Sequence, residues 1–91
     1  MSITVRIPTV LRKFTGDAEC VETEGHDVAE AIENLEAGCP GIKNRIFDDG
    51  GALRRFVNVY LNGEDIRFMS GLKTETPDGC ELSIIPSVAG G

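Results

Sequence analysis

Several residue types are scarce in this chain of 91 residues, and each shortage excludes a class of function. There is no tryptophan, one histidine and three cysteines, Cys20, Cys39 and Cys80, whose spacing contains no CxxC pair. A zinc site needs about four histidine, cysteine or acidic ligands, so we expect no metal site. An odd number of widely spaced cysteines is a poor disulfide framework and favours free thiols in a reducing, cytoplasmic compartment.

Positive charge is also scarce. The chain has 9 Lys and Arg residues against 15 Asp and Glu residues, which gives a net charge of −6. Nucleic acids and anionic membranes select basic surfaces, so we expect neither as a partner. No apolar run reaches about 20 residues and the start has no signal-peptide pattern, which favours a cytoplasmic protein. The length fits one small domain.

Alternating apolar and polar residues predict four β-strands and one shorter extended segment. Residues 3–7 form a half-buried strand, because Ile, Val and Ile alternate with Thr and Arg. Residues 18–23 form a weaker strand that pairs with the first in antiparallel fashion. Residues 55–61 show the strongest pattern, and an Asn-Gly turn separates them from a short segment at 66–68. The last strand is predicted at 81–86.

The clearest helix follows Asp27, a good N-cap, with Glu30 three residues later as in a capping box. Apolar residues then recur at i, i+3, i+4 and i+7 and form one stripe. These are Val28, Ala31, Ile32 and Leu35. Gly38 ends the helix and Pro40 prevents its restart. About 11 residues are too few for a stable isolated helix in water, so the stripe must pack on the sheet.

The order β-β-α-β-short β-β predicts an α+β roll, a mixed sheet with one main helix packed across one face. Residues 9–13 are expected to connect the first two strands, and residues 40–53 to form a loop with at most one short helical turn. The predicted core combines the inward-facing positions of the helix and the strands. Its members are Ile3, Val5, Ile7, Val28, Ile32, Leu35, Val57, Val59, Leu61, Leu82 and Ile84.

The titratable residues do not predict an enzyme. His26 lies beside Asp27, but the sequence marks no nucleophile and no oxyanion site for this pair, so a small enzyme that uses His26 is a remote alternative. Eight of the 15 acidic residues lie in residues 17–36, where there is no Lys or Arg. Two interpretations of this segment stay open, a solvated outer face or a surface complementary to a basic partner.

The C-terminus carries the most specific signal, since a short run of small residues follows the last predicted strand. It consists of Val88, Ala89, Gly90 and Gly91. We expect residues 1–86 to form the domain and residues 87–91 to form a flexible tail. Two glycines have no Cβ and can enter a narrow channel. A terminal carboxylate becomes an acyl donor once ATP adenylates it, so this tail suits a carrier of an activated acyl group.

Several segments resemble the ubiquitin-like sulfur carrier proteins of the ThiS/MoaD family, and within it the CysO-type carriers. Residues 82–91 read LSIIPSVAGG, residues 7–12 read IPTVLR, residues 55–60 read RFVNVY and residues 65–68 read DIRF. The resemblance covers nearly the whole chain. It implies a β-grasp, ubiquitin-like fold, which agrees with the α+β roll predicted from the residues.

The resemblance implies a protein cosubstrate with no cofactor of its own. An E1-like adenylyltransferase would use ATP to adenylate the Gly91 carboxylate, and a sulfur donor would convert it to a thiocarboxylate. In CysO-type pathways a PLP-dependent synthase then forms a carrier–amino-acid adduct, and a zinc metalloprotease releases cysteine. The alternatives are a carrier for thiamin or molybdopterin synthesis and a ubiquitin-like modifier of protein lysines.

The open face of the sheet is the expected docking surface. If Val57 and Val59 face the helix, then Phe56, Tyr60 and Ile85 face outward and form an apolar patch near the tail. Aromatic side chains are frequent anchors of protein interfaces, so we expect partner binding there. The alternative is that a loop covers these three residues.

Overall fold

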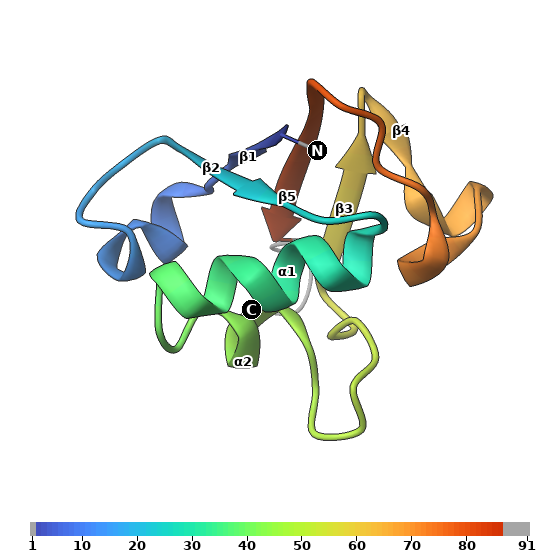
Figure 1. Ribbon diagram of the computed structural model, residues 1–91. Helices are drawn as coiled ribbons and strands as arrows, with labels where there is room; N and C mark the ends of the chain where they lie inside the picture. The colour runs from blue at the N-terminus through green and yellow to red at the C-terminus, as the bar shows by residue number, and fades with distance from the viewer. Residues whose placement is uncertain (1, 87–91) are drawn as a thin grey trace.

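The computed structural model describes residues 2–86, in which one helix crosses one face of a five-stranded sheet (Figure 1). The strands are β1 (Ser2–Arg6), β2 (Cys20–Glu24), β3 (Val57–Leu61), β4 (Glu64–Asp65) and β5 (Cys80–Pro86). The helices are α1 (Val28–Gly38) and α2 (Lys43–Ile46), and the 3-10 turns are η1 (Thr9–Phe14), η2 (Ile66–Phe68) and η3 (Gly71–Lys73). This arrangement confirms the predicted α+β roll.

The sheet is mixed, with the strand order β2-β1-β5-β3-β4. Strand β1 is antiparallel to β2 and parallel to β5, and β3 is antiparallel to both β5 and β4. The first and last strands are therefore neighbours in the middle of the sheet. Strand β5 is paired with β1 up to Ser83, whereas its last three residues are paired with β3 alone, as far as Pro86 opposite Val57.

The register aligns the apolar positions of all the long strands on the helix side. Val5 lies opposite Leu82 of β5, and Val59 of β3 lies opposite Ile84. Because side chains alternate between the two faces of a strand, this register buries every second residue of β1, β3 and β5. The alternation of apolar and polar residues in the sequence therefore arises because the helix covers one face of the sheet.

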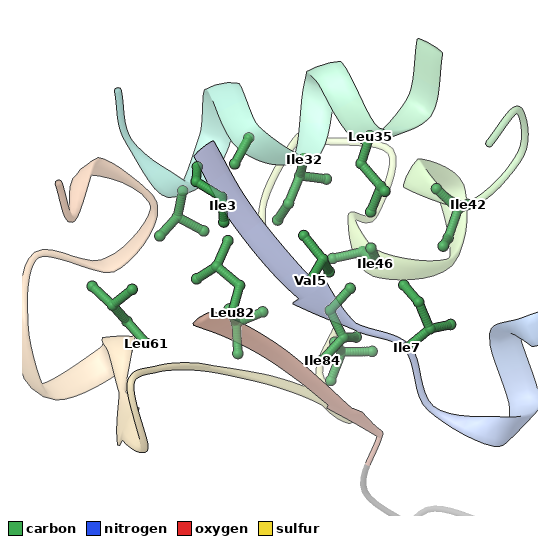
Figure 2. Close-up of a cluster of buried hydrophobic side chains, with 14 of the residues drawn as sticks. Ile3, Val5, Ile7, Ile32, Leu35, Ile42, Ile46, Leu61, Leu82 and Ile84 are labelled. Atoms are coloured by element: carbon green, nitrogen blue, oxygen red, sulfur yellow. The ribbon is translucent and has the colours of Figure 1, made fainter. Parts of the chain in front are cut away.

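The predicted core is confirmed, since all its members are buried. Figure 2 shows Ile32 and Leu35 of α1 pointing toward the sheet, while Ile42 and Ile46 fill one end of the core. The buried apolar residues outside the predicted core list come mostly from turns and from the α2 region, together with Ala31 of the predicted helix stripe. They are Leu11, Ala31, Cys39, Ile42, Ile46, Phe47, Ile66 and Cys80.

The start of α1 has the predicted cap. Asp27 Oδ1 accepts a 2.8 Å hydrogen bond from the Glu30 backbone N–H, and Glu30 Oε1 accepts a 2.7 Å bond from the N–H of His26. The reciprocal bond therefore reaches the residue before the cap rather than the cap itself. The bond to Asp27 satisfies one of the N–H groups that a helix leaves unpaired at its N-terminus, and the bond from His26 ties the preceding residue to the first turn.

The predicted position of the short strand is wrong. Residues 66–68 form a 3-10 turn rather than a strand, and the short strand is Glu64–Asp65. The Asn62-Gly63 turn, with φ of 50° and 88°, leads directly into β4, and the Asp65 carboxylate then caps η2 by accepting from the Arg67 N–H at 2.8 Å. The connection at 9–13 is also more regular than expected, because Thr9–Phe14 forms a 3-10 helix.

The strand predicted at 55–61 begins two residues later, so Phe56 lies in the turn that precedes β3. The short helical turn expected within 40–53 is present as α2. Within residues 2–86, no helix combines the length and the apolar character needed to cross a membrane.

Candidate partner-binding surface at the end of strand β5

The tail residues Val88, Ala89, Gly90 and Gly91 lie outside the described residues. The candidate site is therefore defined by its base, Pro86, the last residue of β5 and the partner of Val57 in the β3–β5 register. Two pockets meet here, one of about 350 Å³ and one of about 240 Å³, and Pro86 lines both. Any protein that engages the end of β5 meets these two surfaces.

The larger pocket, which we call the basic pocket, combines an apolar wall with three cations. The cations come from three separate segments: Lys13 from η1, Arg45 from α2, and Arg54 from the loop before β3. The apolar wall consists of Val10, Leu11, Val57, Ile84 and Pro86. Val10 is 63% exposed, so this wall continues onto the surface.

The cations of the basic pocket are held by neutral groups. Lys13 Nζ lies 5.4 Å from the centroid of the Phe14 ring, and Arg45 Cζ lies 5.8 Å from the same centroid, both within cation–π range. Arg54 donates from Nε to the Asn44 carbonyl oxygen at 2.7 Å. None of these contacts neutralises a charge, so the pocket keeps its positive character.

The smaller pocket lies on the other side of Pro86 and is mixed in charge. Arg6, Arg12 and Glu19 line it together with Ile85, other residues of β5, and Ile7 and Pro8, which follow β1. Arg12 donates from Nε to the Ile7 carbonyl oxygen at 3.2 Å. This pocket joins the end of β5 to the open face of the sheet.

The predicted apolar patch lies on that open face. Phe56 is 45% exposed and Ile85 is 44% exposed, whereas Tyr60 is half-buried. Ile85 lies opposite Asn58 in the register, so Tyr60, two positions after Asn58, is its diagonal neighbour. Phe56 lies in the turn just before β3, outside this register. The structure thus places Tyr60 and Ile85 on neighbouring strands and leaves much of Phe56 and Ile85 exposed.

The remaining candidate residues lie away from the end of β5. The Asp27 carboxylate caps α1, because its Oδ1 accepts from the Glu30 backbone N–H. Cys39 and Cys80 are buried free thiols, and burial raises the pKa of both; Glu36 adds to the rise at Cys39. Cys20 is free and exposed. Among residues 2–86, no three His, Cys, Asp or Glu side chains are grouped so as to hold a metal ion.

Most of the acidic segment 17–36 lies on strand β2 and helix α1. Glu36 has a specific task, because its carboxylate accepts from the backbone N–H groups of Gly41 at 2.9 Å and Lys43 at 2.8 Å. The hydrogen bond from Gly41 has the largest effect on the pKa of Glu36 and lowers it. The bond from the Lys43 backbone and the nearby Lys43 charge lower this pKa further. Part of the acidic segment thus secures the turn after α1.

Sequence reasoning missed the basic pocket. Its three cations are separated by 32 and 9 positions in the chain, and only the docking of η1 and α2 near the end of β5 brings them together. The one signal in the sequence was the absence of Lys and Arg from residues 17–36, which forces the positive charge onto the rest of the surface.

This fold defines a class of protein, the ubiquitin-like β-grasp domain, in which the last strand, here β5, lies in the centre of the sheet. The chain belongs to the ThiS family, whose model matches residues 5–91. It is 46% identical to the sulfur carrier protein CysO of Mycobacterium tuberculosis, with 100% of both chains covered. It is 30% identical to small archaeal modifier protein 3 of Haloferax volcanii, again with 100% of both chains covered.

The structural comparison agrees with the sequence comparison. The chain superimposes with a TM-score of 0.91 on a chain of the BexX/CysO complex of Amycolatopsis orientalis, at 48% identity, covering 98% of this chain and 99% of that chain. The resemblance to the ThiS family and the β-grasp fold predicted from the sequence are both confirmed.

Proposed function

We propose that this chain is a sulfur carrier, a protein cosubstrate rather than an enzyme. The observation that carries the proposal is the 46% identity, over the full length of both chains, to a protein named as a sulfur carrier. The C-terminal Gly90-Gly91 pair and the central position of β5 support it, because together they present a thin acyl tail from a rigid base. Residues 1–86 form the carrier domain and residues 87–91 the tail.

The reaction takes place at the Gly91 carboxylate. A carboxylate oxygen attacks the α-phosphate of ATP, pyrophosphate leaves, and an acyl-adenylate remains on the carrier. A hydrosulfide ion delivered by the donor then attacks the acyl carbon; the C–S bond forms, the C–O bond to AMP breaks, AMP leaves, and loss of the sulfur-bound proton gives the thiocarboxylate. The E1-like adenylyltransferase supplies the ATP site, so this chain needs only to position its tail.

The carrier then delivers sulfur to a small-molecule acceptor, for which cysteine or a related sulfur metabolite is the proposed product. A PLP-dependent synthase would form the carrier–amino-acid adduct, and a zinc metalloprotease would release the amino acid. The BexX/CysO complex supports the general idea that a carrier of this kind docks on another protein. Carriers for thiamin or molybdopterin synthesis use the same tail chemistry and remain alternatives for the final acceptor.

A second candidate function is protein modification. It is favoured by the full-length match to small archaeal modifier protein 3, at 30% identity. Both functions require adenylation of Gly91, and they differ in the acceptor. Isopeptide-linked adducts of this chain on other proteins would favour the modifier, whereas a terminal thiocarboxylate without such adducts would favour the carrier.

The test is ATP-dependent pyrophosphate exchange with the E1-like enzyme of the same organism. Deleting Gly91 shortens the reach of the tail by about 3.3–3.6 Å, and a misplacement of about 1 Å already costs roughly a hundredfold in rate. Deletion of Gly91, addition of one residue after it, and Gly90→Val should each abolish exchange while the domain stays folded. If the deletion variant exchanges pyrophosphate as fast as the parent chain, the carrier mechanism is wrong.

Intact-mass analysis of the protein purified from its own cells provides the second readout. The expected result is a species in which one sulfur replaces one oxygen, with the extra mass on the C-terminal peptide. A C-terminal peptide that carries only the ordinary carboxylate, in cells grown under sulfur demand, would argue against the carrier.

A further inference from the structure

The basic pocket has no role in the proposed reaction at the Gly91 carboxylate, although three cations line it. Lys13, Arg45 and Arg54 line it, and among residues 2–86 no acidic residue shares the lining. The ion pairs that this part of the chain shows lie elsewhere and involve none of the three. Three cations gathered at one pocket repel one another, and a bound anion would offset that repulsion.

The position of the cluster is notable because the chain as a whole is acidic, with a net charge of −6. Five of the nine basic residues line the two pockets that meet at Pro86, whereas Glu19 is the one acidic residue among the lining residues described. A partner that approaches the tail therefore meets a positive region on an otherwise negative molecule. Such a field orients the encounter and raises the association rate of an acidic partner.

The wall of the pocket indicates what kind of anion fits. Val10, Leu11, Val57, Ile84 and Pro86 contribute apolar surface next to the cations. A phosphate group alone would leave this surface without a partner. A protein segment with an apolar side chain beside Asp or Glu residues would cover both parts, as interfaces with an apolar centre and a charged rim do.

We infer that the basic pocket receives an acidic segment of the activating enzyme, in which Asp or Glu side chains lie beside an apolar residue. The inference rests on the proposed function, because the partner is the enzyme that engages the tail. Binding at Pro86 would hold the base of the tail at a fixed position, so that residues 87–91 extend from a docked anchor. The pocket is then a specificity surface that separates this enzyme from others.

The first test reverses single charges. Lys13→Glu and Arg54→Glu are compared with Lys73→Glu, which changes the net charge equally but lines a different pocket with His26 and Glu75. In pyrophosphate exchange, each pocket variant should raise the KM for the carrier by at least about fivefold with little change in kcat, because charges at an interface act mainly on association. Lys73→Glu should change KM less than about twofold.

Salt provides an internal check. The KM of the parent should rise between about 0.01 M and 0.15 M salt, where the Debye length falls from about 30 Å to about 8 Å. The KM of Lys13→Glu should rise less, since part of the attraction is already lost. Lys13 is a suitable first choice because its ammonium contacts only the Phe14 ring among the interactions described, so its loss leaves the fold intact.

The second test identifies the partner chemistry directly. A zero-length carbodiimide joins an amine to a carboxylate in contact with it, and the chain has three lysines: Lys13, Lys43 and Lys73. In the complex with the enzyme, Lys13 should be joined to an Asp or Glu of the enzyme. Lys43 should be joined to Glu33 of its own chain, since these two form an ion pair, and this product is the positive control.

The outcomes separate the inference from the proposed function. If the parent shows no exchange, the proposed function fails before the pocket is tested. If the parent is active but Lys13→Glu and Arg54→Glu behave like Lys73→Glu, or if Lys43–Glu33 coupling occurs without a Lys13 link to the enzyme, the inference is wrong. Binding of ATP alone to the free carrier, seen as NMR shifts confined to the pocket, would instead assign it to a nucleotide and also overturn the inference.

Discussion

The hydroxyl of Thr76 donates a 2.8 Å hydrogen bond to the carbonyl oxygen of Gly25, 51 positions earlier in the chain. The backbone N–H of Thr76 also donates to the His26 carbonyl oxygen, and the Val28 N–H donates to the Thr74 carbonyl oxygen. Thr76 is 1% exposed. These bonds fasten the segment before β5 to the start of α1, so the helix and the central strand are fixed relative to each other.

Thr76→Val should therefore destabilise the domain. Valine has nearly the same shape, but it leaves the buried Gly25 carbonyl without a donor, which costs about 1–3 kcal/mol. Thr23→Val is the matched control, because its hydroxyl lies 3.5 Å from the Ala31 carbonyl oxygen and should be worth well under 1 kcal/mol. Urea unfolding at constant m-value measures both. Equal midpoints for the two variants would contradict the role given to Thr76.

Glycine itself is required at position 25 because the chain just after β2 passes close to the helix backbone. A Cβ at this position would lie 2.6 Å from the backbone nitrogen of Ala31 and 2.9 Å from its Cα. The obstacle is backbone, so it cannot rotate away, and Gly25→Ala should cost at least about 1–3 kcal/mol. Gly38→Ala is the control, since nothing lies within 4 Å of its added Cβ, and it should stabilise α1 by up to about 1 kcal/mol. Thermal unfolding should thus move in opposite directions for the two variants.

The core and the main elements were predictable because they depend on local periodicity. Alternation over 3–7 and 81–86, and the stripe from Val28 to Leu35, specify which side chains face inward wherever one face of a sheet is covered. The segment 66–68 was misread because its apolar–polar–apolar order is the order expected of a strand. The structure buries Ile66 and leaves Phe68 83% exposed, so the two side chains do not share one face as they would in a strand.

The candidate site was predictable in part. The outward positions of Phe56 and Ile85 follow from alternation, even though Phe56 lies just before β3. The basic pocket depends on how η1, α2 and the loop before β3 pack around the end of β5, which is tertiary information with no local pattern. For the same reason the burial of Ile42 and Ile46, which close that end of the core, was not foreseen.

The stability of the domain should depend on the ionisation of Glu36. Its pKa is lowered in the folded chain, chiefly by the backbone bonds from Gly41 and Lys43, so the folded state binds a proton less readily than the unfolded state. The stabilisation is present above the ordinary glutamate pKa of about 4.3 and is lost as pH falls through the lower folded value. Thermal unfolding between neutral and acidic pH should therefore show a smaller fall in Tm for Glu36→Gln than for the parent. Glu64→Gln, in β4, serves as the control. If its Tm falls between neutral and acidic pH by as little as the Tm of Glu36→Gln does, the role given to Glu36 is wrong.

The apolar patch of Phe56, Tyr60 and Ile85 should bind the activating enzyme through apolar contact rather than through charge. Tyr60→Ala and Ile85→Ala remove side chains that are diagonal neighbours on β3 and β5, and Phe56→Ala removes a side chain of the turn just before β3. Aromatic anchors in the centre of an interface commonly cost 2 kcal/mol or more when truncated, so the aromatic variants should raise the KM of the carrier in pyrophosphate exchange by roughly tenfold or more.

Three measurements distinguish a role of this patch in partner docking from a purely structural role. The rise in KM should be nearly independent of salt, in contrast to the basic pocket, because buried apolar area is not screened. Circular dichroism and the unfolding midpoint should stay close to those of the parent for Phe56→Ala and Ile85→Ala, whose side chains are about half exposed. Phe68→Ala, at an 83% exposed phenylalanine of η2, should leave KM unchanged. If Phe68→Ala weakens exchange as much as Phe56→Ala does, or if the patch variants exchange at the parent rate, the activating enzyme does not dock on this face.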